Sequence, residues 1–241
     1  MTTRFNELGL RIGPELPDWI ARPRPPHAVM QGRYCRVEPL DPERHAADLH
    51  AANSLDREGR MWTYLLSGPF GSFDAYQAWL ESKRGSEDPL FFAFVDATSG
   101  RAVGLGSFLR IDPANGSVEV GHLQYSPLMQ RTAVATEAMY LMMKTAFELG
   151  YRRYEWKCDA LHARSRLAAE RLGFTFEGVF RQAVVYKGRN RDTAWFSIID
   201  SEWPQLDAAY RAWLDPANFD AAGRQVMSLV ETRRQEQASK G

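Results

Sequence analysis

The sequence contains only two cysteines, Cys35 and Cys158. A disulfide scaffold needs more bridges than one pair can form, and no Cys or His spacing typical of a metal site is present. The sequence therefore predicts a protein of a reducing, cytoplasmic compartment without a bound metal. We expect both thiols to stay reduced and to have no catalytic part.

Long apolar runs and an excess of one charge are also missing. No run approaches the ~18 apolar residues of a membrane-spanning helix, and the N-terminus, with Glu7, Glu15 and Asp18, lacks the apolar segment of a signal peptide. Thirty Lys and Arg balance thirty Asp and Glu. That balance argues against a protein whose main task is to grip nucleic acid. The 241 residues, 44% hydrophobic and 25% charged, suit one globular domain with appendages.

Proline is concentrated at the N-terminus, where Pro14, Pro17, Pro23, Pro25 and Pro26 exclude a long helix or a central strand. Apolar residues in the same segment favour an arm that packs on the surface of the domain rather than one that is free in solvent. We expect three regions: a proline-rich arm over 1–31, a compact domain over 32–203 and a helical tail over 204–241.

Periodicity and turn signals predict a mixed α/β sheet flanked by helices. The expected order is a strand near 34–38, two helices, a three-strand meander, a helix, a strand, a second helix and two last strands. The central piece is a parallel crossover, in which strand 117–125 leads through helix 132–149 to strand 151–158. Gly150 suits the end of that helix, which is apolar almost all round and should lie deep in the fold.

The start of the crossover helix could bind a phosphate. The first turn of a helix has free N–H groups and a partial positive charge. Arg131 adds a cation at the entrance, and small residues let a ligand approach the backbone. A Thr-capped core helix with no ligand explains the same residues. The segment is Gln130, Arg131, Thr132, Ala133, Val134, Ala135 and Thr136.

Three motifs in order resemble the GNAT acetyltransferases, in particular the ribosomal-protein-alanine N-acetyltransferase (RimJ/RimL-like) branch. They are Val118 to Gly121, the loop just described, and Ser165 with the later Arg171-Leu172-Gly173-Phe174. The resemblance covers about residues 33–200. In the family the loop reads Gln-x-x-Gly-x-Gly/Ala, whereas both glycine positions are alanine here. Alanine fits there if both residues have ordinary helical dihedrals.

The resemblance implies that acetyl-coenzyme A is the co-substrate, without a metal. It implies that amides of Gln130–Thr136 bind the pyrophosphate and that the strand amides of Leu123, Gln124 and Tyr125 hold the acyl group and pantetheine. His162 takes the position at which the branch often has Asn, on the loop before the later helix. Ordinary strand pairing would occupy those strand amides with no ligand.

The family reaction needs a base for the amine and an acid for the departing thiolate. Glu119 matches a strand position where relatives place a carboxylate base, and His122 is a second candidate. The two residues lie on opposite faces of a regular strand, so they face one cleft only if a bulge intervenes. The family's usual tyrosine acid is replaced by Ala169, which leaves Ser165. No nucleophile with a paired base is evident, which favours direct transfer.

Acceptor binding is predicted for Trp62 and Tyr64, between the first two helices, and for Tyr186 near the last hairpin. The basic residues Lys187, Arg189 and Arg191 at that hairpin tip are typical of a solvated turn. The acceptor is an amine, either a protein N-terminus or a small molecule. Two other functions stay open: a catalytically silent acyl-coenzyme A-binding module, and an interaction domain whose arm and tail form a homodimer. No membrane or nucleic-acid partner is expected.

Overall fold

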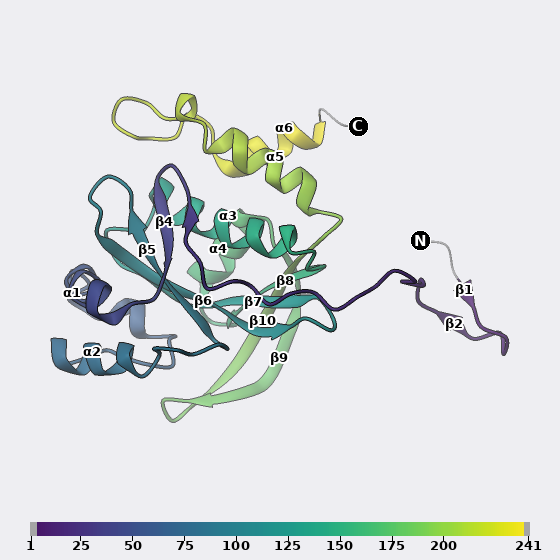
Figure 1. Ribbon diagram of the computed structural model, residues 1–241, viewed down its shortest axis with the longest axis horizontal. Coiled ribbons are helices and arrows are strands. Elements are labelled where there is room, and N and C mark those ends of the chain that lie inside the picture. Colours follow the sequence, from purple (N-terminus) through teal and green to yellow (C-terminus); the bar gives the residue numbers. More distant parts are fainter. Residues whose placement is uncertain (1–3, 239–241) are drawn as a thin grey trace.

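The computed structural model describes residues 4–238, and its centre is an eight-stranded mixed sheet with the order β3-β4-β5-β6-β7-β8-β10-β9 (Figure 1). All neighbours are antiparallel except β7 and β8. The predicted fold class is confirmed. The strands are β3 Met30–Gln31, β4 Cys35–Pro39, β5 Leu90–Asp96, β6 Ala102–Asp112, β7 Ser117–Tyr125, β8 Arg153–Asp159, β9 Thr175–Tyr186 and β10 Arg189–Ile199.

The helix α3, Ala133–Glu148, makes the predicted crossover between the parallel strands. The Thr132 side chain caps its start by accepting from the Ala135 amide, and Gly150 with φ 83° follows its last turn. Every residue of α3 from Val134 to Met143 is buried. The sequence pattern of an all-apolar helix therefore reflects a position between the sheet and the C-terminal helices.

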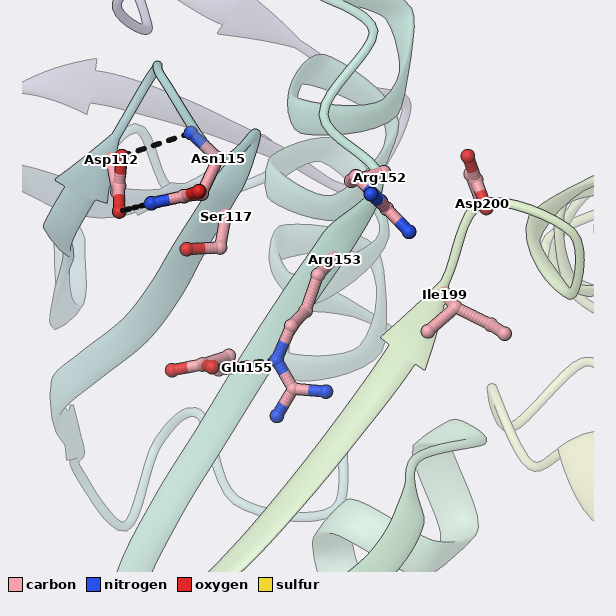
Figure 2. Close-up of a pocket in the computed structure, with 8 residues that line it drawn as sticks. All are labelled: Asp112, Asn115, Ser117, Arg152, Arg153, Glu155, Ile199 and Asp200. Atoms are coloured by element: carbon pink, nitrogen blue, oxygen red, sulfur yellow. Dashed lines mark hydrogen bonds and ion pairs between the residues drawn. The ribbon is translucent and has the colours of Figure 1, made fainter. Parts of the chain in front are cut away.

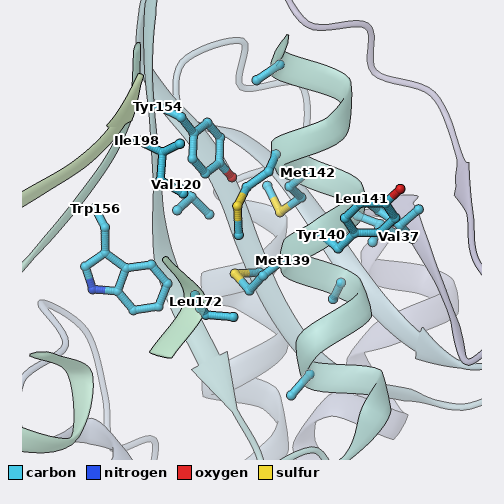
Figure 3. Packing of buried hydrophobic residues seen from close by; sticks show 14 of the residues in the cluster. Val37, Val120, Met139, Tyr140, Leu141, Met142, Tyr154, Trp156, Leu172 and Ile198 are labelled. Carbon is cyan, nitrogen blue, oxygen red and sulfur yellow. The ribbon is translucent and has the colours of Figure 1, made fainter. Parts of the chain in front are cut away.

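Helices cover both faces of the sheet (Figure 1). On one face lie α3, α4 and the C-terminal helices, and on the other lie α1 and α2. The large core lies on the α3 face, where Met139, Met142 and Leu172 surround Tyr154 and Trp156 of β8 (Figure 3). A smaller core lies under α1 and α2 and includes Trp62. The helices are α1 Pro42–Asn53, α2 Phe73–Glu81, α4 Ala163–Leu172, α5 Trp203–Trp213 and α6 Leu229–Ala238.

The predicted helical tail is interrupted. A short 3-10 turn, Pro216–Asn218, follows α5, and an irregular segment then leads to α6. The Asp215 side chain caps this turn, and Pro216 cannot continue the preceding helix. Among residues 4–238, no helix combines the length and the apolar character that a membrane crossing requires.

The N-terminal arm divides into two parts. Its second part docks as predicted: the Trp19 indole donates to the Ala114 carbonyl at 2.8 Å, and the Arg22 amide donates to the Pro113 carbonyl at 2.9 Å. Its first part forms a small hairpin, β1 Arg4–Phe5 with β2 Arg11–Ile12, that projects away from the body (Figure 1). For that first part the prediction of docking was wrong within this chain.

Candidate active site

The parallel strands β7 and β8 open into a wedge. Their pairing runs from Ser117 with Arg153 to Val120 with Trp156. In the part of the chain that the structure describes, no pairing between the two strands continues beyond that point, although both strands do. Backbone groups on the β8 side of Leu123, Gln124 and Tyr125 are therefore open to a ligand, as the prediction for these residues requires.

A β-bulge lies in β7 at the mouth of the wedge. On β6, Leu105 pairs with Gln124 and Ser107 with Gly121, so β7 carries one extra residue. His122 takes a positive φ of 52° in this bulge. The bulge is the irregularity that would let Glu119 and His122 serve one cleft.

The His122 ring is held on the β6 side of the bulge. Its Nδ1 lies 2.9 Å from the Ser107 hydroxyl, and its ring centroid lies 5.2 Å from that of Phe91. Burial lowers the pKa of His122, and the nearby Lys83 charge lowers it further. The imidazole is therefore held in its neutral form.

Glu119 is buried in an ion-pair network on the β6, β7 and β8 strands. Its Oε2 accepts from Arg110 Nε at 2.8 Å and lies 3.0 Å from the Lys157 ammonium. Lys157, whose side chain is only 3% exposed, also pairs with Glu155 at 2.6 Å and lies 3.5 Å from the Trp195 ring centroid. Both cations share one oxygen of Glu119. The other oxygen, Oε1, lies on the side of Gly121, toward the open end of β7.

The network also keeps the Glu155 carboxyl in its charged form. Burial favours the neutral form of this carboxyl, but ion pairs with Lys157 and Arg153 outweigh burial, so the pKa of Glu155 is lowered. Lys157, the centre of the network, was not singled out from the sequence. A lysine in a strand is usually solvated, and nothing local indicates that two carboxylates flank it.

The predicted phosphate loop has the geometry that its alanines require. Ala133 and Ala135 lie within the first turn of α3, and the positive φ of 62° falls on Arg131 instead. The Gln130 side chain donates to the Tyr125 carbonyl at 2.8 Å, which ties the loop to the end of β7. The first-turn amides of α3 have no intrahelical acceptor, apart from the Ala135 amide that Thr132 caps. Those of Ala133 and Val134 remain available to an anion.

Two side chains of α3 serve the scaffold rather than the loop. The Thr136 hydroxyl is buried and accepts from Arg171 of α4 at 2.7 Å. Glu137 accepts from the amides of Arg33, Tyr34 and Cys35 at 2.9, 2.6 and 2.7 Å, which ties α3 to β4. A Cβ at Gly32 would clash with this carboxylate. Sequence reasoning gave Glu137 no such role.

The start of α4 brings several predicted residues together at the mouth of the wedge. The His162 ring stacks on Tyr64, with 4.3 Å between centroids and 17° between planes. Tyr186 donates to Asp159 at 2.8 Å. Asp159 also accepts from the Leu161 amide, and it was missed because a lone aspartate at a strand end has no distinctive signal. Burial and the Asp159 charge raise the pKa of Tyr186 to about 12.

Trp62, Ser165 and Lys187 are more constrained than the sequence suggested. The Trp62 side chain is buried in the smaller core against Phe70 and Tyr76. Ser165 accepts from the Trp156 indole at 3.1 Å. Lys187 is not merely part of a solvated turn, because its ammonium donates to the Trp62 carbonyl at 2.7 Å and so fastens the β9–β10 tip to the α1–α2 connection.

A separate hollow of about 490 Å³ lies at the other end of β7 and β8 (Figure 2). Ser117, Arg152 and Arg153 place it at the amino-terminal ends of these strands. The wedge opens at their carboxyl ends. Glu155 connects the hollow with the ion-pair network of Glu119, because it lines the hollow and also pairs with Lys157.

This arrangement is that of an acetyltransferase. The family described as "Acetyltransferase (GNAT) domain" matches residues 36–175, which is more than half of the chain. The protein belongs to the GNAT acetyltransferase family.

Two solved structures and one curated relative are similar to this chain. A GCN5-related N-acetyltransferase from Brucella melitensis is 49% identical, with a TM-score of 0.89 over 91% of this chain and 100% of that one. A GNAT-family protein from Chromobacterium violaceum is 41% identical, with a TM-score of 0.75 over 80% of this chain and 96% of its own. The Bacillus subtilis protein YdaF, provisionally named a ribosomal N-acetyltransferase, is 26% identical over 69% of this chain and 90% of its own length.

Three histidines, one buried and two half-buried, make stability depend on pH. Burial lowers the pKa of His45, His122 and His162. The unfolded chain therefore binds these protons at a higher pH than the native protein does, so stability is lost as the pH falls. We expect the free energy of unfolding to decrease between about pH 7 and pH 5, a window set by the ordinary histidine pKa of about 6.5. Urea unfolding at a series of pH values measures this.

The carboxylates and a His122 variant show whether the histidines cause this loss of stability. The carboxylates Glu38 and Glu155 have lowered pKa values, so their contribution disappears only below the histidine window. His122→Gln should keep the fold and reduce the dependence between about pH 7 and pH 5. A free energy of unfolding that is flat across that interval would contradict the assignment of these histidines as neutral in the native protein.

Proposed function

We propose that the protein transfers an acetyl group from acetyl-coenzyme A to a primary amine, directly and without an acyl-enzyme. The observation that carries this proposal is the opening of β7 from β8 beside the first turn of α3, where the Thr132 cap leaves the amides of Ala133 and Val134 free. A thioester with a pyrophosphate-bearing tail needs hydrogen-bond donors for its acyl and pantetheine groups. It also needs an anion site at a fixed distance from them, and the wedge and the helix start offer both.

The residues predicted to bind the cofactor would contact different parts of it. The β7 amides of Leu123, Gln124 and Tyr125 would hold the acyl and pantetheine groups. The first turn of α3, with Arg131, would hold the pyrophosphate. The Gln124 side chain itself is engaged with Tyr76 at 3.1 Å, so its part is that of the backbone. His162, stacked on Tyr64, would border the channel.

The catalytic roles follow from which atoms remain uncommitted. Glu119 Oε2 is held by two cations, so Oε1 is the oxygen that takes the proton of the attacking amine, directly or through water. A new N–C bond forms as the C–S bond breaks, and the thiolate takes a proton from Ser165. The Ser165 oxygen already accepts from Trp156, and its hydroxyl also contacts the Cys158 thiol, so the hydrogen would turn from that thiol to the departing thiolate. Solvent then restores the proton of Ser165 and removes that of Glu119.

His122 is the alternative base. Its lowered pKa keeps it neutral and able to accept a proton, and it lies in the bulge at the mouth of the wedge, where Ser107 holds its ring toward β6. The two cysteines do not compete as nucleophiles. Both are free and buried, and burial raises the pKa of each thiol, so neither forms a thiolate readily. Direct transfer and a reducing, cytoplasmic setting are consistent with this.

The acceptor would enter between Tyr64 and Tyr186. The β9–β10 tip, fastened by Lys187, closes this side of the mouth. The name of YdaF favours a protein N-terminus such as that of a ribosomal protein, and a small amine is the alternative.

The experiment that tests the function is a thiol-release screen with acetyl-coenzyme A, peptides with free N-termini and small amines. We expect release with at least one amine, and a mass increase of one acetyl group on that amine and none on the protein. Calorimetric binding of acetyl-coenzyme A without release for any amine would support the silent binding module instead. Absence of binding would exclude both.

The phosphate site is tested by Ala135→Glu. Ala135 lies in the first turn of α3, so a glutamate there would add a negative charge beside the amides that would hold a pyrophosphate and would repel it. We expect the Kd for acetyl-coenzyme A, measured by calorimetry, to rise at least about 100-fold, which is about 2.7 kcal/mol. Circular dichroism would confirm the fold. An unchanged Kd in a folded variant would place the site elsewhere.

A further inference from the structure

The β1–β2 hairpin holds a defined shape without help from the body. Arg4 pairs with Ile12 and Phe5 with Arg11. The Asn6 side chain accepts from the amides of Leu8 and Leu10 at 3.0 and 2.9 Å, which closes the turn. A two-stranded hairpin on its own is marginally stable in water, so further contacts are needed to maintain it.

The hairpin and the chain just after it present apolar side chains to solvent. The exposed fractions begin at 46% and reach 81% at Leu8. Such a concentration of exposed large apolar groups marks an interaction surface. Trp19 and Arg22 fix the root of the arm on the body, so the hairpin is directed outward (Figure 1). These side chains are Phe5, Leu8, Leu10, Ile12, Leu16 and Ile20.

A second unpartnered surface lies on β9, the last strand of the sheet. Its twelve residues pair with β10 on one side only. Unpaired, apolar edges of this length invite another strand or chain. Phe176, Val179, Phe180, Val184 and Val185 are exposed by 38% or more, with Val185 at 82%.

We propose that the arm of one chain packs against the β9 edge of a second copy, and that the second copy's arm returns the contact. One two-fold operation would cover both unpartnered surfaces of each chain and leave neither open. The root of the arm and the start of β9 lie at the same end of the sheet. Arg152, beside the Trp19 ring, is next to Arg153, which pairs with Glu177 of β9 at 2.5 Å. Each arm therefore projects from the end of the sheet at which β9 begins.

Charge favours a second copy over a polyanion or a lipid surface. The projecting part of the arm carries Arg4 and Arg11 against Glu7 and Glu15, and Arg4 pairs with Glu15 at 3.1 Å. Along β9, Glu177 is balanced by Arg181. Neither surface has the excess of positive charge that binding to nucleic acid or to an anionic membrane requires.

The test is the oligomeric state, measured by sedimentation velocity over a range of concentrations. We expect the full chain to form a dimer. We expect the double variant Leu8→Asp, Leu10→Asp and the single variant Val185→Asp each to raise the dimer Kd at least about tenfold. Val226→Asp is the matched control, because Val226 is 73% exposed in the C-terminal segment, outside both surfaces, and should leave the dimer unchanged.

A cross-linking experiment fixes which surfaces meet. Leu8→Cys in one population and Val185→Cys in another, mixed and treated with a short bis-maleimide, should give a covalent heterodimer. Leu8→Cys mixed with Val226→Cys should not. A monomeric full chain, or a dimer that survives both Asp variants, would overturn the proposal. Loss of the dimer in the arm variant alone would overturn the assignment to β9. These outcomes do not depend on acetyl transfer.

Discussion

Replacing Glu119 by glutamine is expected to lower kcat for acetyl transfer by about 10² to 10⁴, the usual contribution of a general base. Glutamine keeps the shape of the side chain and removes its ability to take a proton. The affinity for acetyl-coenzyme A should stay within about threefold, since the Glu119 carboxylate lies between Arg110 of β6 and Lys157 of β8 and not on the α3 loop. Steady-state kinetics with an acceptor found in the screen, and calorimetry, measure the two quantities.

Glu155→Gln is the matched control for that variant. Glu155 pairs with the same lysine, Lys157, but lies one strand away, so its loss disturbs the ion-pair network without removing the proposed base. We expect kcat to fall by much less in Glu155→Gln than in Glu119→Gln. Equal losses in the two variants would mean that Glu119 acts only through the network. Unchanged turnover of Glu119→Gln between pH 6 and pH 9 would make His122 the base.

Replacing Glu137 by alanine is expected to destabilise the protein by about 3 to 5 kcal/mol. Hydrogen bonds to a charged acceptor contribute about 1.5 to 3 kcal/mol each and are not additive, and buried donors left without a partner add to the cost. The Glu137 carboxylate accepts from three consecutive backbone amides, those of Arg33, Tyr34 and Cys35. Its removal leaves all three N–H donors at the junction of α3 and β4 without an acceptor.

Glu148→Ala on the same helix is the control. Glu148 is largely exposed and its one ion pair among residues 4–238 is with Lys144, so the change should stay within about 0.5 kcal/mol. Urea unfolding of both variants gives the comparison. A Glu137→Ala variant with the stability of Glu148→Ala would show that the three amide contacts do not hold the helix.

Local signals in the sequence were enough to predict the order and bounds of the main elements. The Asp112–Gly116 turn, the Thr132 cap and Gly150 each fix a chain reversal or a helix end through their own chemistry. The break in the C-terminal tail and the division of the arm depend on what the chain packs against. The local sequence around Ala217 and around Phe5 does not by itself specify a structure. Packing against the rest of the chain decides whether these segments become helix or hairpin.

The candidate site was predictable where it is made of backbone. The helix start and the strand amides follow from element positions, and both loop alanines adopt the helical conformation that they need. The side-chain network was not predictable. Lys157, Asp159 and Glu137 act through partners that are distant in sequence, namely Glu119, Tyr186 and the start of β4. The bulge at His122 likewise arises from pairing with β6 and leaves no mark in the residues of β7.

The central claim is that acetyl-coenzyme A lies in the wedge with its pyrophosphate on the first turn of α3. Hydrogen–deuterium exchange with and without acetyl-coenzyme A tests it at the level of single segments. Because the amides of 123–125 that face β8, and those of 131–134, should exchange quickly in the free protein, a bound ligand should slow them strongly. We predict protection concentrated in those two segments. Protection confined to 112–117 and 152–155, around the hollow at the other end of the strands, or absent altogether at saturating acetyl-coenzyme A, would contradict the account.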